Sequence, residues 1–191
     1  MSELFSIQLQ NQQQSRDGVW LDLPTTTEQV QVALRQIGIS SDNPQGLFIS
    51  GYFAEEEKRF AISYNMVLAS NVDELNFLAS RLETLSTGER AELNAALQAP
   101  QSELFSIGRI TDFPENVDYY VHLPDVHGPA QLGDYYLNRS GMVDMPEEWK
   151  GGIDTAQFGR YVAQQEQGAF TQYGYLVKSG DEWQKVHEGQ P

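Results

Sequence analysis

The stretch LGDYYLNRSGMVDMPEEWKGGIDTAQFGRYV, from Leu132 to Val162, brings aromatic residues, turn residues and carboxylates together without a catalytic pattern. Its glycines, at 133, 141, 151, 152 and 159, do not form the GxGxxG or GxxxxGK[ST] loops that cradle phosphates. The chain also lacks the GxSxG elbow of a hydrolase. This stretch therefore indicates a surface that a partner recognises.

The composition narrows the kind of protein and the kind of partner. The chain has 191 residues, 40% of them hydrophobic, which is enough to bury a core, and a formal net charge of -15. Phosphate repels such a chain, so we expect no direct nucleic-acid binding. It contains no Cys, which suits a reducing compartment. Without a signal-peptide pattern or a long apolar run, we expect a soluble cytoplasmic protein, with no membrane contact and no cofactor.

The negative charge is concentrated in one region. Residues 102–154 carry ten acidic and three basic residues, so this quarter of the chain holds almost half of the net charge. Duplex DNA presents one charge per roughly 1.7 Å of its axis. Carboxylates three or four positions apart on a helix lie roughly 5–6 Å apart and could imitate a row of phosphates. The alternative from charge alone is an acidic surface that only aids solubility.

Sequence patterns predict an α+β fold. Alternating residues predict strands at 4–9 and 19–23, and residues 46–53 form a third strand after a helix capped by Thr25 and Glu28. Two further helices follow the capping signals at Asn71 and Ser86. We expect the apolar faces of these two helices to pack on each other or on a neighbouring element.

The C-terminal part mixes strands and helices. We predict a strand at 117–122, a helix from Pro129 to Arg139, and a short helix capped by Asp154. A β-like run covers residues 170–177, and the tail after Gly180 is expected to be loose.

A metal-dependent enzyme is the alternative from a different class. His122 and His127 flank Asp125, so two imidazoles and a carboxylate could in principle bind a metal ion. The spacing matches no metalloenzyme signature, and a short loop is poorly placed to converge three ligands. We therefore expect no metal and no catalytic residues.

The order of motifs in the C-terminal stretch resembles the antirestriction signature of the ArdA family, DNA-mimicking inhibitors of type I restriction-modification enzymes. The segment Gly18 to Pro24, GVWLDLP, also resembles the opening strand of that family. The residues that carry the signature resemblance are Tyr135, Tyr136, Gly141, Pro146, Trp149, Ile153, Asp154, Phe158, Gly159 and Arg160.

The resemblance implies an elongated chain of three small modules that dimerises into a curved acidic rod. The modules are a β-rich one at 1–60, a helical one at 61–101 and an α+β one at 102–191, which carries the signature and the dimer interface. It further implies a protein without enzymatic activity that occupies the DNA-binding groove of the specificity and methyltransferase subunits. The alternative target of such a DNA mimic is another nucleic-acid-targeting defence complex, such as a CRISPR effector.

Two sets of residues follow from this resemblance. The first is a set of aromatic side chains expected in the dimer interface or the core: Tyr135, Tyr136, Trp149 and Phe158. The second is the expected DNA-mimicking surface: Asp73, Glu74, Glu83, Asp112, Glu115, Asp118, Asp125, Asp134, Asp144, Glu147, Glu148 and Asp154.

Overall fold

The computed structural model describes residues 3–13, 17–40 and 44–186, and these form two compact units. The first unit comprises the described residues of Met1–Ser86 and Leu104–Pro114, together with residues 185 and 186. The second comprises Thr87–Glu103 and Glu115–Gln184. The α+β class is confirmed, and the division into three modules stays a prediction.

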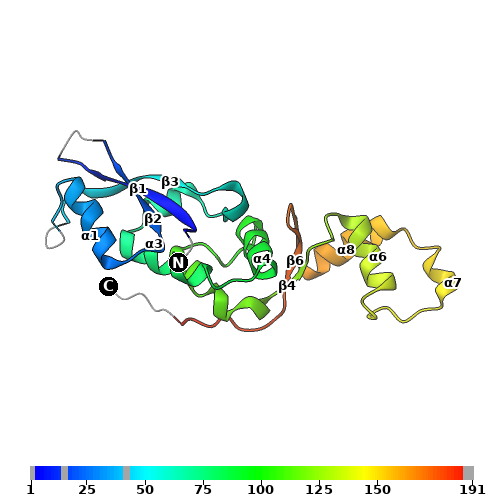
Figure 1. Ribbon diagram of the computed structural model, residues 1–191. Coiled ribbons are helices and arrows are strands. Elements are labelled where there is room, and N and C mark those ends of the chain that lie inside the picture. Colours follow the sequence, from blue (N-terminus) through cyan, green and yellow to red (C-terminus); the bar gives the residue numbers. More distant parts are fainter. Residues whose placement is uncertain (1–2, 14–16, 41–43, 187–191) are drawn as a thin grey trace. The chain divides into compact units, whose positions relative to one another are not determined.

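The first unit is built on a three-stranded antiparallel sheet of order β2-β1-β3 (Figure 1). Its strands are β1 (Phe5–Asn11), β2 (Val19–Leu23) and β3 (Leu47–Phe53). Phe5, Ile7 and Leu9 are at most 2% exposed, so the alternation that predicted β1 also identified its buried face. The polar turn expected after β1 includes residues 14–16, which lie outside the described residues.

The helix α1 (Thr27–Gln36) joins β2 to β3 and completes the predicted β-β-α-β order. Its N-cap is Thr26, whose side chain accepts a hydrogen bond from the backbone N–H of Gln29, so the predicted cap at Thr25 is wrong by one residue. Thr25 is held instead by Asn76, which accepts from its N–H at 2.7 Å and donates to its carbonyl at 3.0 Å. This pairing keeps Thr25 outside the helix.

The longest helix of this unit is α3 (Val72–Leu82). Asn71 caps α3 by accepting from the N–H of Glu74 at 2.9 Å, as its spacing predicted. The helix packs against β2 and against α5 (Ile107–Thr111). The helix α2 (Tyr64–Leu68) contacts β3, and the 3-10 helix η1 (Glu56–Lys58) follows β3.

The second unit contains an antiparallel sheet of order β4-β6-β5, formed by β4 (Tyr120–Leu123), β5 (Ala169–Thr171) and β6 (Gly174–Lys178). The helix α4 (Thr87–Gln98) packs on β4 and β6, so its apolar face is covered by a neighbouring sheet. Two sequence predictions are corrected. Residues 117–119 form the 3-10 helix η3 (Val117–Tyr119), which follows η2 (Phe113–Glu115), and residues 170–177 form a hairpin.

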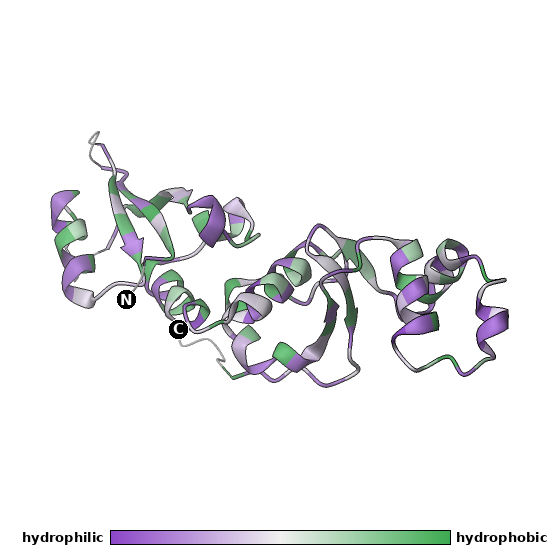
Figure 2. Ribbon diagram, turned by 45° about the vertical axis from the view of Figure 1, so that its right-hand side comes forward, coloured by the Kyte–Doolittle hydropathy of each residue, from purple (hydrophilic) through white to green (hydrophobic). Residues whose placement is uncertain are grey.

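The second strand of this hairpin, β6, begins at Gly174, whose φ of +120° is a conformation that favours glycine. Three helices complete the second unit: α6 (Pro129–Asn138), α7 (Glu147–Lys150) and α8 (Thr155–Glu166). Pro129 begins α6 and Asp154 caps α8, both as predicted. Figure 2 shows that α6 and α8 each carry hydrophilic and hydrophobic residues, as expected for helices that cover a core on one side.

Side-chain and backbone contacts hold Trp183 and Gln184, so the expectation of a loose segment after Gly180 is wrong for these residues. Asn116 donates to the carbonyl of Gln184 at 2.9 Å and accepts from its N–H at 2.7 Å. The ring of Trp183 lies edge-on to Tyr119, with 5.1 Å between centroids. No helix within the described ranges is both long enough and apolar enough to span a membrane.

Candidate recognition surface

The signature stretch folds into a pair of helices that touch through two glycines. A Cβ atom on Gly133 of α6 would lie 1.9 Å from the carbonyl oxygen of Thr155. A Cβ on Gly159 of α8 would lie 1.8 Å from the carbonyl oxygen of Pro129. Real atoms cannot approach so closely, so the contact between α6 and α8 requires glycine at both positions.

A carboxylate joins these helices to the sheet. Glu166, at the end of α8, accepts hydrogen bonds from the hydroxyls of Tyr136 in α6 and Tyr175 in β6; the Tyr175 bond is 3.0 Å long. Burial and these bonds to an anion raise the pKa of both tyrosines far above the ordinary range. Both hydroxyls therefore stay protonated and keep donating at physiological pH.

Sequence reasoning missed Glu166, because its role depends on two tyrosines that are 30 and 9 positions away. Tyr175 is fully buried with Val126, Leu132 and Ala163, and Tyr135 and Tyr136 pack against this core. Both tyrosines therefore contribute to the fold of the second unit.

The other two predicted aromatic residues differ in exposure. Phe158 is half-buried in α8, whereas Trp149 in α7 is 65% exposed. Trp149 is thus excluded from the core of this chain. Its participation in a dimer interface stays a prediction.

We expect Glu166→Ala to lower the free energy of unfolding by about 1–3 kcal/mol, because two tyrosine hydroxyls, one on a fully buried side chain, lose their acceptor. Urea unfolding at pH 7 measures this change. Gln165→Ala, on the exposed side of the same helix, is the matched control and should change stability by less than about 0.5 kcal/mol. Equal stability of the two variants would contradict the assigned role of Glu166.

Most of the predicted carboxylates lie where a partner can reach them. All the candidates in the second unit are exposed or partly exposed: Glu115, Asp118, Asp125, Asp134, Asp144, Glu147, Glu148 and Asp154. In the first unit, Asp73 is exposed, and Glu74 and Glu83 are partly exposed. Asp112 is only 3% exposed, so it does not lie on the surface. It is the C-cap residue of α5 and is flanked in the sequence by the buried residues Thr111 and Phe113.

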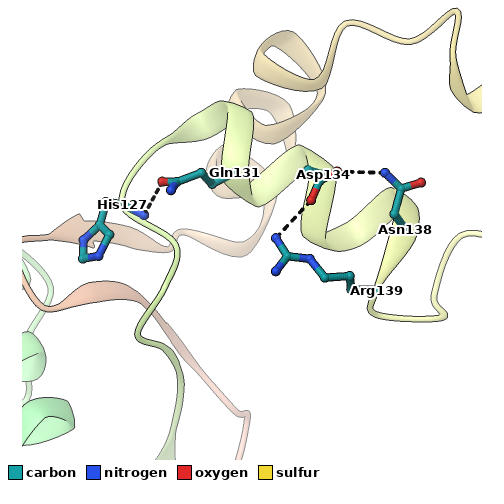
Figure 3. Close-up of polar contacts among 5 residues, drawn as sticks. All are labelled: His127, Gln131, Asp134, Asn138 and Arg139. Atoms are coloured by element: carbon teal, nitrogen blue, oxygen red, sulfur yellow. Dashed lines mark hydrogen bonds and ion pairs between the residues drawn. The ribbon is translucent and has the colours of Figure 1, made fainter.

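Basic side chains accompany two of these carboxylates. Figure 3 shows Asp134 between Asn138 and Arg139. The Nδ2 of Asn138 donates to Oδ1 of Asp134 at 2.9 Å, and the Nη2 of Arg139 lies 3.0 Å from Oδ2 of Asp134. Glu147 pairs with Lys150 at 2.9 Å. Arg139, Asp134 and Glu147 are 47% exposed or more in these pairs, whereas Lys150 is only 17% exposed. Both pairs reduce the local negative charge, and such ion pairs at the surface contribute little to stability.

The carboxylates are not arranged as a row along one helix, which was the arrangement expected from spacing. Asp154 caps α8, Glu147 and Glu148 begin α7, and Asp73 and Glu74 lie in the first turn of α3. Acidic residues are favoured at these positions because free N–H groups and the helix dipole attract negative charge. Much of the acidic surface therefore lies at the N-terminal ends of helices.

The two histidines of the alternative metal site form hydrogen bonds with other parts of the chain. The Nε2 of His122 lies 2.7 Å from the carbonyl oxygen of Tyr173, so this ring nitrogen donates to the backbone. His127 meets α6 through its backbone N–H, which donates to Gln131 at 2.8 Å (Figure 3). Within the described part of the chain, no three His, Asp or Glu side chains gather as metal ligands.

These features define a small acidic α+β protein whose exposed carboxylates form its most prominent surface property. The family model described as "Antirestriction protein (ArdA)" matches residues 13–177, and the chain therefore belongs to this family. Its members are non-enzymatic antirestriction proteins, and membership implies inhibition of type I restriction-modification enzymes. The metal-enzyme alternative is accordingly not retained. No curated protein matches the chain.

Proposed function

We propose that the protein inhibits a type I restriction-modification enzyme by occupying the DNA-binding groove of its specificity and methyltransferase subunits. The observation that supports this mechanism is that seven predicted carboxylates in the second unit of an antirestriction family member are exposed and an eighth, Asp134, is partly exposed. A groove that binds DNA carries positive charge. Such a groove cannot reject a carboxylate surface without also weakening its binding of DNA.

The proposal includes a dimer formed through the C-terminal part of the chain, and an elongated, curved acidic form of that dimer. Large apolar side chains are exposed in the second unit: Met142 at 76%, Trp149 at 65% and Tyr161 at 60%. Tyr, Trp and Met are enriched in protein–protein interfaces relative to the rest of the protein surface. Trp149 belongs to the aromatic set predicted from the sequence, and Met142 and Tyr161 add to it.

We expect the combined change Asp125→Asn, Asp144→Asn and Glu148→Gln to weaken inhibition about 10- to 150-fold. Each of these exposed carboxylates would contribute about 0.5–1 kcal/mol in contact with a basic groove. The measurement is the concentration that halves DNA cleavage by a purified type I enzyme. Each single change should have little effect, because the interaction is spread over many charges.

The matched control replaces the three exposed glutamates at 55–57 by glutamine, which changes the net charge by the same amount outside the predicted surface. We expect this control to inhibit almost as well as the unchanged protein. Equal weakening by both triple variants would show that only net charge matters and would contradict a defined mimic surface. A single change that abolished inhibition without unfolding would argue against distributed contacts.

A further inference from the structure

A groove of about 370 Å³ lies along β2 in the first unit, between this strand and α1. It is lined by four consecutive residues of the strand, Val19, Trp20, Leu21 and Asp22. Consecutive strand residues point to opposite faces of a sheet, so lining by all four places the groove along an edge. Among the strands that the structure describes, β2 pairs with β1 alone, in the order β2-β1-β3, so its other edge is not paired with a strand.

The groove exposes apolar groups from both of its walls. Trp20 is 50% exposed, and Val32 of α1 is 45% exposed. The indole lies against the sheet where Gly51 of β3 leaves space, since a Cβ on Gly51 would lie 3.0 Å from Cη2 of Trp20. One broad aromatic ring is thus held on the sheet and remains accessible to a partner.

Two carboxylates, those of Glu3 and Asp22, line the same groove as this ring. The Oγ of Ser6 lies 2.8 Å from Oδ1 of Asp22 and 3.3 Å from Oε1 of Glu3. A serine hydroxyl has one proton and can satisfy only one of the two carboxylates at a time. Among the residues that the structure describes, no Lys or Arg forms an ion pair with Glu3 or Asp22 or lies over the Trp20 ring.

An arginine side chain matches these features. Its guanidinium stacks on aromatic faces and binds carboxylates through several N–H donors in a fixed plane. An extended segment that carries it can add to a free strand edge by main-chain hydrogen bonds, with alternate side chains entering the groove. Apolar neighbours of the arginine would then meet Val32 and the apolar part of the groove.

We propose that the groove along β2 is a docking site for an extended, arginine-containing segment of a partner protein, whose guanidinium stacks on Trp20 and pairs with Asp22 and Glu3. This site goes beyond the proposed function. It lies in the first unit, uses carboxylates outside the predicted mimic surface, and requires no DNA-binding enzyme.

The test titrates the full-length protein, at 150 mM salt, with the peptide acetyl-Val-Arg-Val-Arg-Val-amide while the indole N–H signals of Trp20, Trp149 and Trp183 are followed by NMR. We expect a saturable shift at Trp20 and little change at the other two. The same peptide with citrulline in place of arginine keeps the shape without the charge, and its binding should be at least about threefold weaker.

Asp22→Asn keeps an acceptor for Ser6 but removes the negative charge of the side chain. It should raise the dissociation constant of the peptide about threefold or more. Glu3→Gln is a second variant with the same expectation. Glu57→Gln removes one exposed charge outside the groove and should leave binding unchanged. The proposal is overturned by an absent or non-saturable Trp20 shift, by equal binding of the citrulline peptide, or by equal weakening in Glu57→Gln.

Discussion

Replacing Gly159 by Ala is expected to destabilise the second unit by about 3 kcal/mol or more. The added methyl group would lie 1.8 Å from the carbonyl oxygen of Pro129, which belongs to the backbone of α6 and cannot rotate away. The helices α6 and α8 would have to separate. Overpacking that shifts side chains and backbone typically costs about 1–3 kcal/mol and occasionally more, and a clash between backbones this close falls at the upper end of that range. Gly133→Ala should act similarly against Thr155. Thermal unfolding followed by circular dichroism measures both effects.

The matched control is Gly88→Ala in α4 of the same unit. A Cβ at Gly88 would have no neighbour within 4 Å, and alanine favours the helix over glycine by about 0.5–1 kcal/mol. We therefore expect this variant to be as stable as the unchanged protein or slightly more stable. If Gly159→Ala unfolded at the same temperature as Gly88→Ala, the close helix contact would not exist in solution.

The second large effect concerns Glu92 of α4. Burial, together with the negative charges of Asp118 and Glu89, raises the pKa of Glu92 to about 8. Its Oε1 is buried without a hydrogen-bond partner among the described residues. In the folded protein this carboxyl is therefore mostly neutral at pH 7.

A carboxyl with a raised pKa in the folded protein stabilises the fold fully below its ordinary pKa of 4.5. This stabilisation is lost as the pH rises towards about 8, because the unfolded chain releases the proton first. Glu92→Gln cannot ionise and should remove this pH dependence. At pH 8.5 we expect it to be about 1–3 kcal/mol more stable than the unchanged protein, allowing for partial solvent exposure, and about equal at pH 4.5.

Urea unfolding at pH 4.5 and pH 8.5 measures both differences. Glu148→Gln serves as the control, since it removes one exposed negative charge from the same unit. The control should show little dependence on pH. A Glu92→Gln variant with the same stability difference at both pH values would contradict a neutral, buried Glu92.

Local signals in the sequence identified many of the elements. The alternation in β1, the caps at Asn71 and Asp154, and the start of α6 at Pro129 were all predicted from the chain. These features depend on neighbouring residues only, because strand faces and helix caps are set within a few positions.

Contacts between distant residues account for what the sequence did not reveal. The hexapeptide SELFSI occurs at 2–7 and at 102–107, and the described part of the first copy enters β1. In the second copy, Phe105 is 66% exposed and Ser106 caps α5. Identical residues thus adopt different structures because β1 pairs with two strands whereas α5 packs on α3.

For the candidate surface too, the sequence predicted the acidic residues but not the contacts that some of them make. Its carboxylates were predicted from charge density and family resemblance, and most of them are exposed. The burial of Asp112, the pairing of Asp134 with Arg139 and the role of Glu166 depend on how elements fold together. No pattern along the chain could have revealed these contacts.

The most direct test of the proposed mimicry is competition between the protein and DNA. A labelled duplex bound to a type I methyltransferase is titrated with the protein at 50 mM and at 200 mM salt. DNA mimicry predicts stoichiometric displacement of the duplex at low salt, together with salt-sensitive binding of the protein to the enzyme. A duplex that stays bound at excess protein would contradict occupancy of the DNA-binding groove.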